Sequence, residues 1–116
     1  MNFDPKPYLE FHRSEKARQE LAVQTRLVQA RQEALRLAQT LSRHLAGLRS
    51  IWLFGSVARG DPSRPDFDID LALEGGDLYQ AWDCVEDSPF AVDLVSLEHL
   101  PLHFRQKVEA TGIKLT

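Results

Sequence analysis

The short stretch "DFDID", residues 66 to 70, places three carboxylates on alternate positions of an otherwise apolar segment. Side chains alternate between the two faces of a strand, so Asp66, Asp68 and Asp70 would share one face. Carboxylates held this close repel one another and resist desolvation, and a bound cation relieves both costs. Asp68 and Asp70 suit Mg²⁺, which takes oxygen ligands and keeps waters that a substrate phosphate can replace. Asp66 directly follows Pro65, and we expect it to begin the strand rather than to bind a metal.

A third acid, Asp93, stands alone among apolar residues in "AVDLV", residues 91 to 95, at the middle of another predicted strand. A lone carboxylate in a core strand is costly unless something compensates it. A metal shared with Asp68 and Asp70 would do so. Three carboxylates from two strands therefore predict a site for one or two magnesium ions.

The segment "FGSVARG", residues 54 to 60, is typical of a phosphate-binding turn between a strand and a short helix. Backbone N–H groups at a helix N-terminus attract anions, and a glycine lets the backbone approach them closely. Gly55 and Ser56 are the expected phosphate contacts, with Arg59 as a further candidate. A Gly-Ser turn alone is a weak signal. Here only eleven residues separate it from Asp68, and Asp93 follows downstream.

The elements that must position these residues are readable from periodicity and turn residues. No Gly or Pro interrupts residues 9 to 46, where apolar side chains recur at helical spacing, and we expect one helix from a cap at Ser14 to a stop at Gly47. Strands are predicted at residues 50–54, 67–73, 90–97 and 113–116, and helices at residues 77–87 and 98–112.

Strands separated by helices after a leading helix indicate an α/β or α+β sheet domain. The 116 residues suit one domain, with an N-terminal extension and long helix at 1–47 and the sheet region with the candidate site at 48–116. No apolar run approaches the roughly 20 residues of a membrane span. No secretion signal is recognised, and the single Cys84 fits a reducing compartment, so we expect a cytoplasmic protein.

Charge is distributed unevenly along the chain. Residues 13–49 carry eight Lys or Arg and three Glu, a net charge of +5, whereas residues 50–116 carry a net charge of −7. The acidic half argues against direct nucleic-acid binding there and favours a cation. The basic half is either a solvated helix face or a surface for an anionic partner.

The motifs Gly55-Ser56, Asp68-x-Asp70 and the later strand residue Asp93 resemble the signature of the polymerase-β-like nucleotidyltransferases. The stretch "LFGSVARGDPSRPDFDIDLAL" is similar to the minimal members of that family, which accompany HEPN-domain proteins in toxin–antitoxin pairs. The resemblance covers about residues 48 to 116. It implies the nucleotidyltransferase fold, a small mixed sheet with flanking helices, here preceded by the long helix.

The resemblance also implies a reaction. Two Mg²⁺ ions, or Mn²⁺ in their place, held by Asp68, Asp70 and Asp93 would act on the α-phosphate of a nucleoside triphosphate, ATP by expectation. Gly55 and Ser56 would hold the β- and γ-phosphates. The acceptor would be a hydroxyl of a partner protein, by resemblance a tyrosine of a HEPN toxin, so the chain would be an adenylylating antitoxin.

Two other functions remain open from the sequence. A binding module could neutralise its partner by occlusion, although the intact Gly-Ser and three Asp favour chemistry. A small-molecule nucleotidyltransferase is disfavoured because no acceptor-recognising domain is evident.

The long helix carries a separate expectation. About 33 residues at roughly 1.5 Å each exceed what four short strands can cover. We expect residues 14 to 30 to contact another protein chain, a partner or a second copy, through Leu21, Val23, Leu27 and Val28. The alternative is a helix that breaks near Gln24 or Thr25 and folds back on its own domain.

Overall fold

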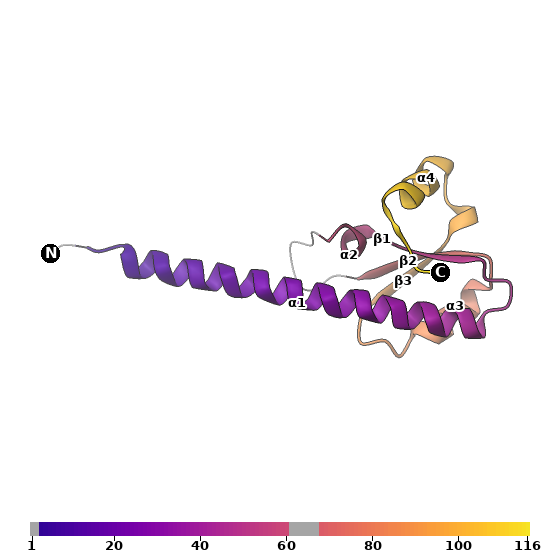
Figure 1. Ribbon diagram of the computed structural model, residues 1–116, viewed down its shortest axis with the longest axis horizontal. Helices are drawn as coiled ribbons and strands as arrows, with labels where there is room; N and C mark the ends of the chain where they lie inside the picture. Colours follow the sequence, from indigo (N-terminus) through magenta and orange to yellow (C-terminus); the bar gives the residue numbers. More distant parts are fainter. Residues whose placement is uncertain (1–2, 61–67) are drawn as a thin grey trace.

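The computed structural model describes residues 3–60 and 68–116 of the chain. Four strands form one sheet in the order β3-β2-β1-β4 (Figure 1). β1 is antiparallel to β2 and to β4, whereas β2 and β3 are parallel. This mixed sheet with flanking helices confirms the expected α+β architecture. The elements are α1 (Lys6–His44), β1 (Ser50–Phe54), α2 (Gly55–Arg59), β2 (Ile69–Glu74), α3 (Leu78–Val85), β3 (Val92–Ser96), a 3-10 turn η1 (Leu97–His99), α4 (Leu102–Thr111) and β4 (Ile113–Lys114).

α1 is a single helix of 39 residues, as expected, and the alternative of a break near Gln24 or Thr25 is excluded. The predicted start at Ser14 is also wrong, because the helix begins at Lys6. Pro5 precedes the first turn, and the Asp4 carboxylate accepts a hydrogen bond from the Lys6 N–H at 3.0 Å. Proline fixes a φ that suits a helix start, and aspartate satisfies a backbone N–H group that has no partner inside the helix.

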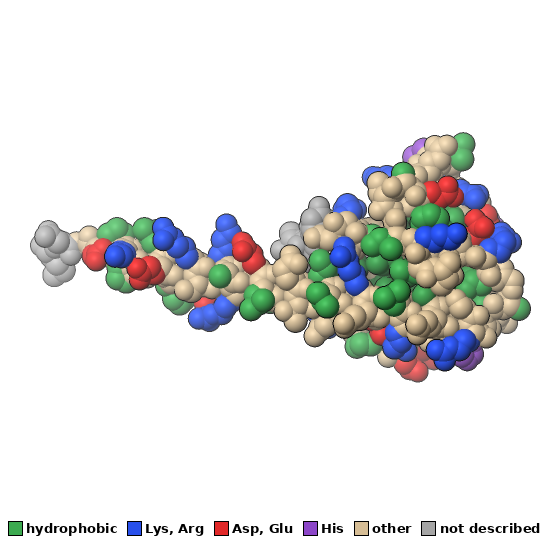
Figure 2. Space-filling view, viewed as in Figure 1, with side chains coloured by type: hydrophobic (Ala, Val, Ile, Leu, Met, Phe, Trp, Pro, Cys, Tyr) green, Lys and Arg blue, Asp and Glu red, His purple; other side chains and the backbone are tan. Residues whose placement is uncertain are grey.

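The two halves of α1 lie in different surroundings. Its buried apolar side chains begin at Leu27 and end at Leu41, and they pack on the sheet. We call residues 27–44 the packed half and residues 6–26 the stem. The stem projects from the sheet region as a narrow arm of mixed apolar, basic and acidic side chains (Figures 1 and 2). It stretches the molecule to 73 × 31 × 18 Å.

The sheet separates two unequal cores. One face carries Ile51, Leu53, Leu71 and Leu73 against α1 and α3, and this is the larger core. The other face carries the smaller cluster of Ala72, Leu97 and Val108, with Trp52, Phe54 and Val95 packed against it. Figure 1 shows α4 on this second face, opposite α1 and α3. Because side chains alternate along a strand, any residue in phase with Ala72 points to the α4 side.

The C-terminal helix is shorter than predicted. Residues 98–112 were expected to form one helix, but η1 ends at His99 and α4 begins only at Leu102. Pro101 lies between them as the N-cap of α4. A proline ring disfavours the helical conformation of the residue before it, so the chain turns at Leu100 and restarts.

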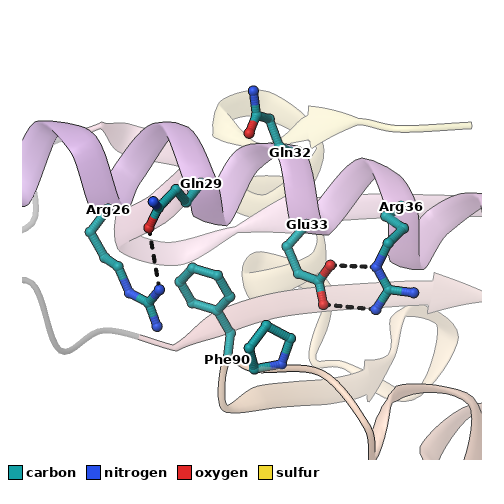
Figure 3. A pocket seen from close by; sticks show the side chains of 7 residues that line it. Arg26, Gln29, Gln32, Glu33, Arg36 and Phe90 are labelled. Atoms are coloured by element: carbon teal, nitrogen blue, oxygen red, sulfur yellow. Dashed lines mark hydrogen bonds and ion pairs between the residues drawn. The ribbon is translucent and has the colours of Figure 1, made fainter.

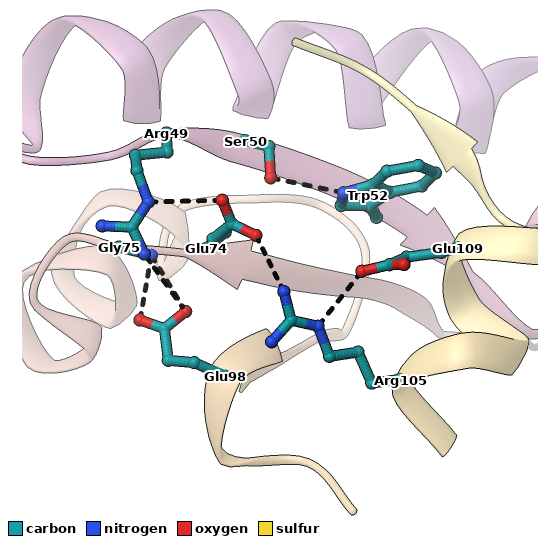
Figure 4. A network of polar contacts seen from close by, with 8 residues as sticks. All are labelled: Arg49, Ser50, Trp52, Glu74, Gly75, Glu98, Arg105 and Glu109. Carbon is teal, nitrogen blue, oxygen red and sulfur yellow. Dashed lines mark hydrogen bonds and ion pairs between the residues drawn. The ribbon is translucent and has the colours of Figure 1, made fainter. Parts of the chain in front are cut away.

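A polar network holds α4 against one end of β2 (Figure 4). Glu74, the last residue of β2, accepts hydrogen bonds from Arg49 at 3.2 Å and from Arg105 of α4 at 3.4 Å. Arg105 also donates to Glu109 at 3.1 Å, and the Glu98 carboxylate accepts from the Gly75 N–H at 3.1 Å. This network marks the end of β2 that lies away from Asp70. Among the described residues, none of the helices has the length and apolar character needed to cross a membrane.

Candidate functional site

Three of the predicted site residues meet at the start of β2. Asp70 is the second residue of β2, and its Cα partners are Phe54, at the end of β1, and Asp93 of β3. Asp68 immediately precedes the strand. Asp70 is in phase with Ala72, so its carboxylate lies on the α4 side of the sheet. Asp66 lies outside the described residues.

Gly55 lies directly against the Asp70 carboxylate. It has a φ of +75°, and a Cβ atom placed there would collide with the Oδ2 atom of Asp70. Only glycine combines that backbone conformation with the absence of a side chain. The turn after β1 and the first acid of β2 therefore form one close-packed unit, as the spacing of the two motifs suggested.

Asp70 is the electrostatic centre of this unit. Burial, together with the charges of Asp93 and Asp68, raises its pKa to about 6, and the Arg59 guanidinium opposes that rise. A carboxyl group whose charged form is this disfavoured requires a proton or a cation. The three charged residues that act on Asp70, namely Asp93, Asp68 and Arg59, are all predicted site residues.

Asp93 differs from the expectation in one respect. It was expected inside a core strand, but its side chain is exposed because β3 is the edge strand of the sheet. Asp68 is exposed as well. The desolvation cost therefore falls on Asp70, which is half-buried. The exposure of Asp93 depends on the position of β3 at the edge of the sheet, and strand order cannot be predicted from the sequence of one strand.

The carboxylates suit a divalent cation by their chemistry. Carboxylate oxygens such as those of Asp68, Asp70 and Asp93 are the ligand type that Mg²⁺ and Mn²⁺ prefer. Within residues 3–60 and 68–116, no three or more His, Cys, Asp or Glu side chains already surround an ion position. Asp68, Asp70 and Asp93 therefore do not form a complete metal site by themselves in this structure.

α2 carries the two remaining predicted residues. Ser56 lies in its first turn and is half-buried, whereas Arg59 at its last position is exposed. Arg31 of α1 holds the other end of this helix. Its Nε donates to the Val57 carbonyl at 3.1 Å, and its Nη2 donates to the Ala58 carbonyl at 3.2 Å. A cation at a helix C-terminus also complements the helix dipole. Arg31 was missed because it looks like any solvated residue of a basic helix.

A groove runs along α1 on the side of the loop before β3 (Figure 3). The Arg26 guanidinium lies 3.7 Å from the centre of the Phe90 ring and donates to Gln29 at 3.3 Å. Farther along, the Glu33 carboxylate accepts from Arg36 and from Ser88. A separate shallow hollow on the stem side shares Arg26 and Gln29 with it and is also lined by Arg18, Leu21, Ala22 and Thr25. It combines arginines with an apolar floor.

No protein-family model and no curated protein matches the sequence. Two solved structures share the fold. One is the toxin–antitoxin MntA-HpeT in a mutant form with two Asp-to-Glu changes two positions apart, with a TM-score of 0.57 and 22% identity over 70% of each chain. The other is a toxin–antitoxin with AMP-PNP, with a TM-score of 0.57 and 27% identity over 67% of this chain and 68% of that one. The minimal nucleotidyltransferase fold implied by the sequence motifs is therefore confirmed.

Proposed function

We propose that this chain, which has the minimal nucleotidyltransferase fold, is an antitoxin that transfers AMP from ATP to a hydroxyl of its toxin. The observation that carries the proposal is the meeting of Asp68, Asp70 and Asp93 beside Gly55. The similar toxin–antitoxin with AMP-PNP supports nucleotide chemistry. The paired Asp-to-Glu changes in the MntA-HpeT mutant have the spacing of Asp68 and Asp70. By the sequence resemblance, the acceptor is a tyrosine of a HEPN-type toxin.

Each residue of the site has a distinct part in this reaction. Asp68, Asp70 and Asp93 would hold two Mg²⁺ ions, with Mn²⁺ as an alternative, and the metal supplies charge neutralisation at the phosphates. Gly55 lets the turn after β1 lie close against the Asp70 carboxylate, and Ser56 would donate a hydrogen bond to the triphosphate. Arg59 adds positive charge from α2.

The proposed transfer needs only ATP and the acceptor hydroxyl as reactants. The acceptor oxygen forms a bond to the α-phosphorus, and the bond from that phosphorus to the leaving pyrophosphate breaks. The acceptor proton goes to Asp93, whose exposed carboxylate can reach a partner's hydroxyl. The pyrophosphate leaves with the electrons of the broken bond. In this proposal the partner provides the acceptor hydroxyl.

A second function is favoured by the stem. Tyr8, Phe11 and Leu21 are 61%, 59% and 67% exposed on a helix that no other described element covers. Exposed apolar side chains of this size suit a protein contact. Such a contact, with the toxin or with a second copy, would let the chain neutralise its partner by occlusion alone. AMP transfer requires the carboxylates of Asp68, Asp70 and Asp93, whereas neutralisation by occlusion does not.

The decisive experiment removes the carboxylates and keeps the surface. In Asp68→Ala with Asp70→Ala, we expect transfer of label from α-labelled ATP to the toxin to fall to background while the complex still forms. The control is Asp83→Ala with Asp87→Ala, two exposed acids on and after α3, which should transfer label at the wild-type rate. Wild-type transfer by the first variant would refute the catalytic assignment. Full neutralisation without transfer would instead establish occlusion.

A further inference from the structure

A cavity of about 200 Å³ opens beside the carboxylates on the α4 side of the sheet. Phe54 and Gly55 form its wall on the sheet side, and Phe104 and Val108 of α4 form the wall opposite. The Phe54 and Phe104 rings meet edge to face, with centres 6.2 Å apart. Gly55 lines the cavity and also lies against the Asp70 carboxylate, so the cavity is adjacent to the candidate reaction centre.

Two cationic side chains from different elements line this cavity. Arg59 comes from α2, and Lys107 comes from α4. Arg105, two residues before Lys107, is engaged with Glu74 and Glu109. Lys107, in contrast, forms no ion pair with any residue that the structure describes. An apolar hollow with cations at its rim strengthens their attraction for an anion, because the walls exclude water.

We propose that this cavity receives the β- and γ-phosphates of the nucleoside triphosphate, and that Lys107 contacts them together with Arg59. The inference rests on the proposed function, which places the α-phosphate at Asp68, Asp70 and Asp93. From there the next phosphates extend past Gly55 into the cavity. Lys107 is then a specificity residue: it favours a triphosphate over a monophosphate, and it contacts the pyrophosphate group both before and after the bond to the α-phosphorus breaks.

The test compares nucleotides that differ only in their phosphates. Calorimetry with Mg²⁺ measures the affinity of the full chain for ATP, AMP and inorganic pyrophosphate. For Lys107→Gln, we expect about tenfold weaker binding of ATP and of pyrophosphate, a loss typical of one charged hydrogen bond, and unchanged binding of AMP. Lys107→Arg should recover most of the ATP affinity. Lys107 is exposed, so the variant should unfold at the wild-type temperature.

The matched control is Lys114→Gln, which removes an exposed lysine of β4 whose ammonium lies 6.0 Å from the centre of the Trp52 ring and outside the cavity. It should bind all three ligands as the wild type does. Wild-type ATP affinity in Lys107→Gln would overturn the inference while leaving the proposed function intact. Equal losses for ATP and AMP would also overturn it, because the cavity would then take the nucleoside. A wild-type protein that binds no nucleotide would refute the proposed function itself.

Discussion

The two halves of α1 belong to one continuous helix, yet they have different energetic roles. In the packed half Leu37 and Leu41 are completely buried, whereas in the stem Leu21 is 67% exposed. The helix is about 58 Å long at 1.5 Å per residue, and a strand of five residues covers only about 17 Å. The short sheet can cover only part of the helix, and the buried apolar side chains of α1 lie in that part, from Leu27 to Leu41. A substitution in the packed half should therefore lower stability, whereas the matched substitution in the stem should have little effect.

The largest contrast is expected for leucines. Leu37→Ala empties a fully buried position and should lower the free energy of unfolding by about 2–5 kcal/mol. Leu21→Ala, the matched change in the stem, should alter it by less than about 0.5 kcal/mol. Urea denaturation monitored by circular dichroism measures both. Similar losses in the two variants would mean that the stem packs on its own domain in solution.

Two Glu–Arg pairs with the same spacing give the next contrast. In the first pair the Glu33 side chain is nearly buried while Arg36 is exposed, whereas in the second pair Glu15 and Arg18 are both exposed. The hydrogen bond from Arg36, aided by one from Ser88, holds the pKa of Glu33 below its usual value of 4.5 despite burial. Glu33→Gln should therefore cost about 1–2 kcal/mol at neutral pH, and Glu15→Gln about zero.

The pH dependence of the Glu33 contrast has a defined sign. Because the pKa of Glu33 is lower in the folded than in the unfolded state, its stabilisation is complete above pH 4.5. It is lost as the pH falls through the lowered pKa of the folded protein. The difference in unfolding free energy between the wild type and Glu33→Gln should shrink over that window. A difference that stays constant down to the acid limit would assign the effect to packing.

The effects on stability of replacing an arginine in the packed half and one in the stem should differ by a smaller amount. Arg31→Gln removes two hydrogen bonds to carbonyls of α2 and should cost about 1 kcal/mol. It should also weaken Mg²⁺-dependent ATP binding, because α2 carries Ser56 and Arg59. Arg18→Gln in the stem should change neither quantity. Loss of stability with unchanged ATP affinity would show that Arg31 supports the fold without positioning α2 for the nucleotide.

The smallest effect on stability is expected from the largest deletion. Removing residues 1–25 takes away most of the stem, and none of the described residues 3–25 is buried, so the unfolding free energy should change by less than about 0.5 kcal/mol. If the stem is a contact for another chain, the mass in solution or the affinity for the toxin should fall. A truncated protein with the wild-type mass in solution and the wild-type affinity for the toxin would show that the stem is not a contact for another chain.

The sequence predicted the elements better than their surroundings. Period and turn residues located β1 and α3, and the Gly-Ser and Asp-x-Asp motifs lie together as expected. The helix start was wrong because Asp4 and Pro5 provide a stronger signal than Ser14. The exposure of Asp93 follows from β3 being an edge strand, and strand order is set by tertiary contacts.

Arg31 and Lys107 show a different limit of sequence reasoning. Neither belongs to a motif, and each gains its meaning from residues far away in the chain. Arg31 meets the carbonyls of Val57 and Ala58, and Lys107 faces a cavity that begins at Gly55. Basic residues on helices are usually solvated, so only the packing of α1 and α4 around α2 distinguishes these two.

The straightness of α1 sets a length scale for recognition. From Tyr8, near the tip of the stem, to Arg31, where the helix touches α2, the axis runs about 35 Å at 1.5 Å per residue. A continuous helix of that length keeps its tip at a fixed distance from α2. A toxin that binds the tip of the stem would contact the helix about that far from the point where Arg31 reaches α2. Lengthening or shortening the rod by whole turns would then select a different acceptor on the same partner.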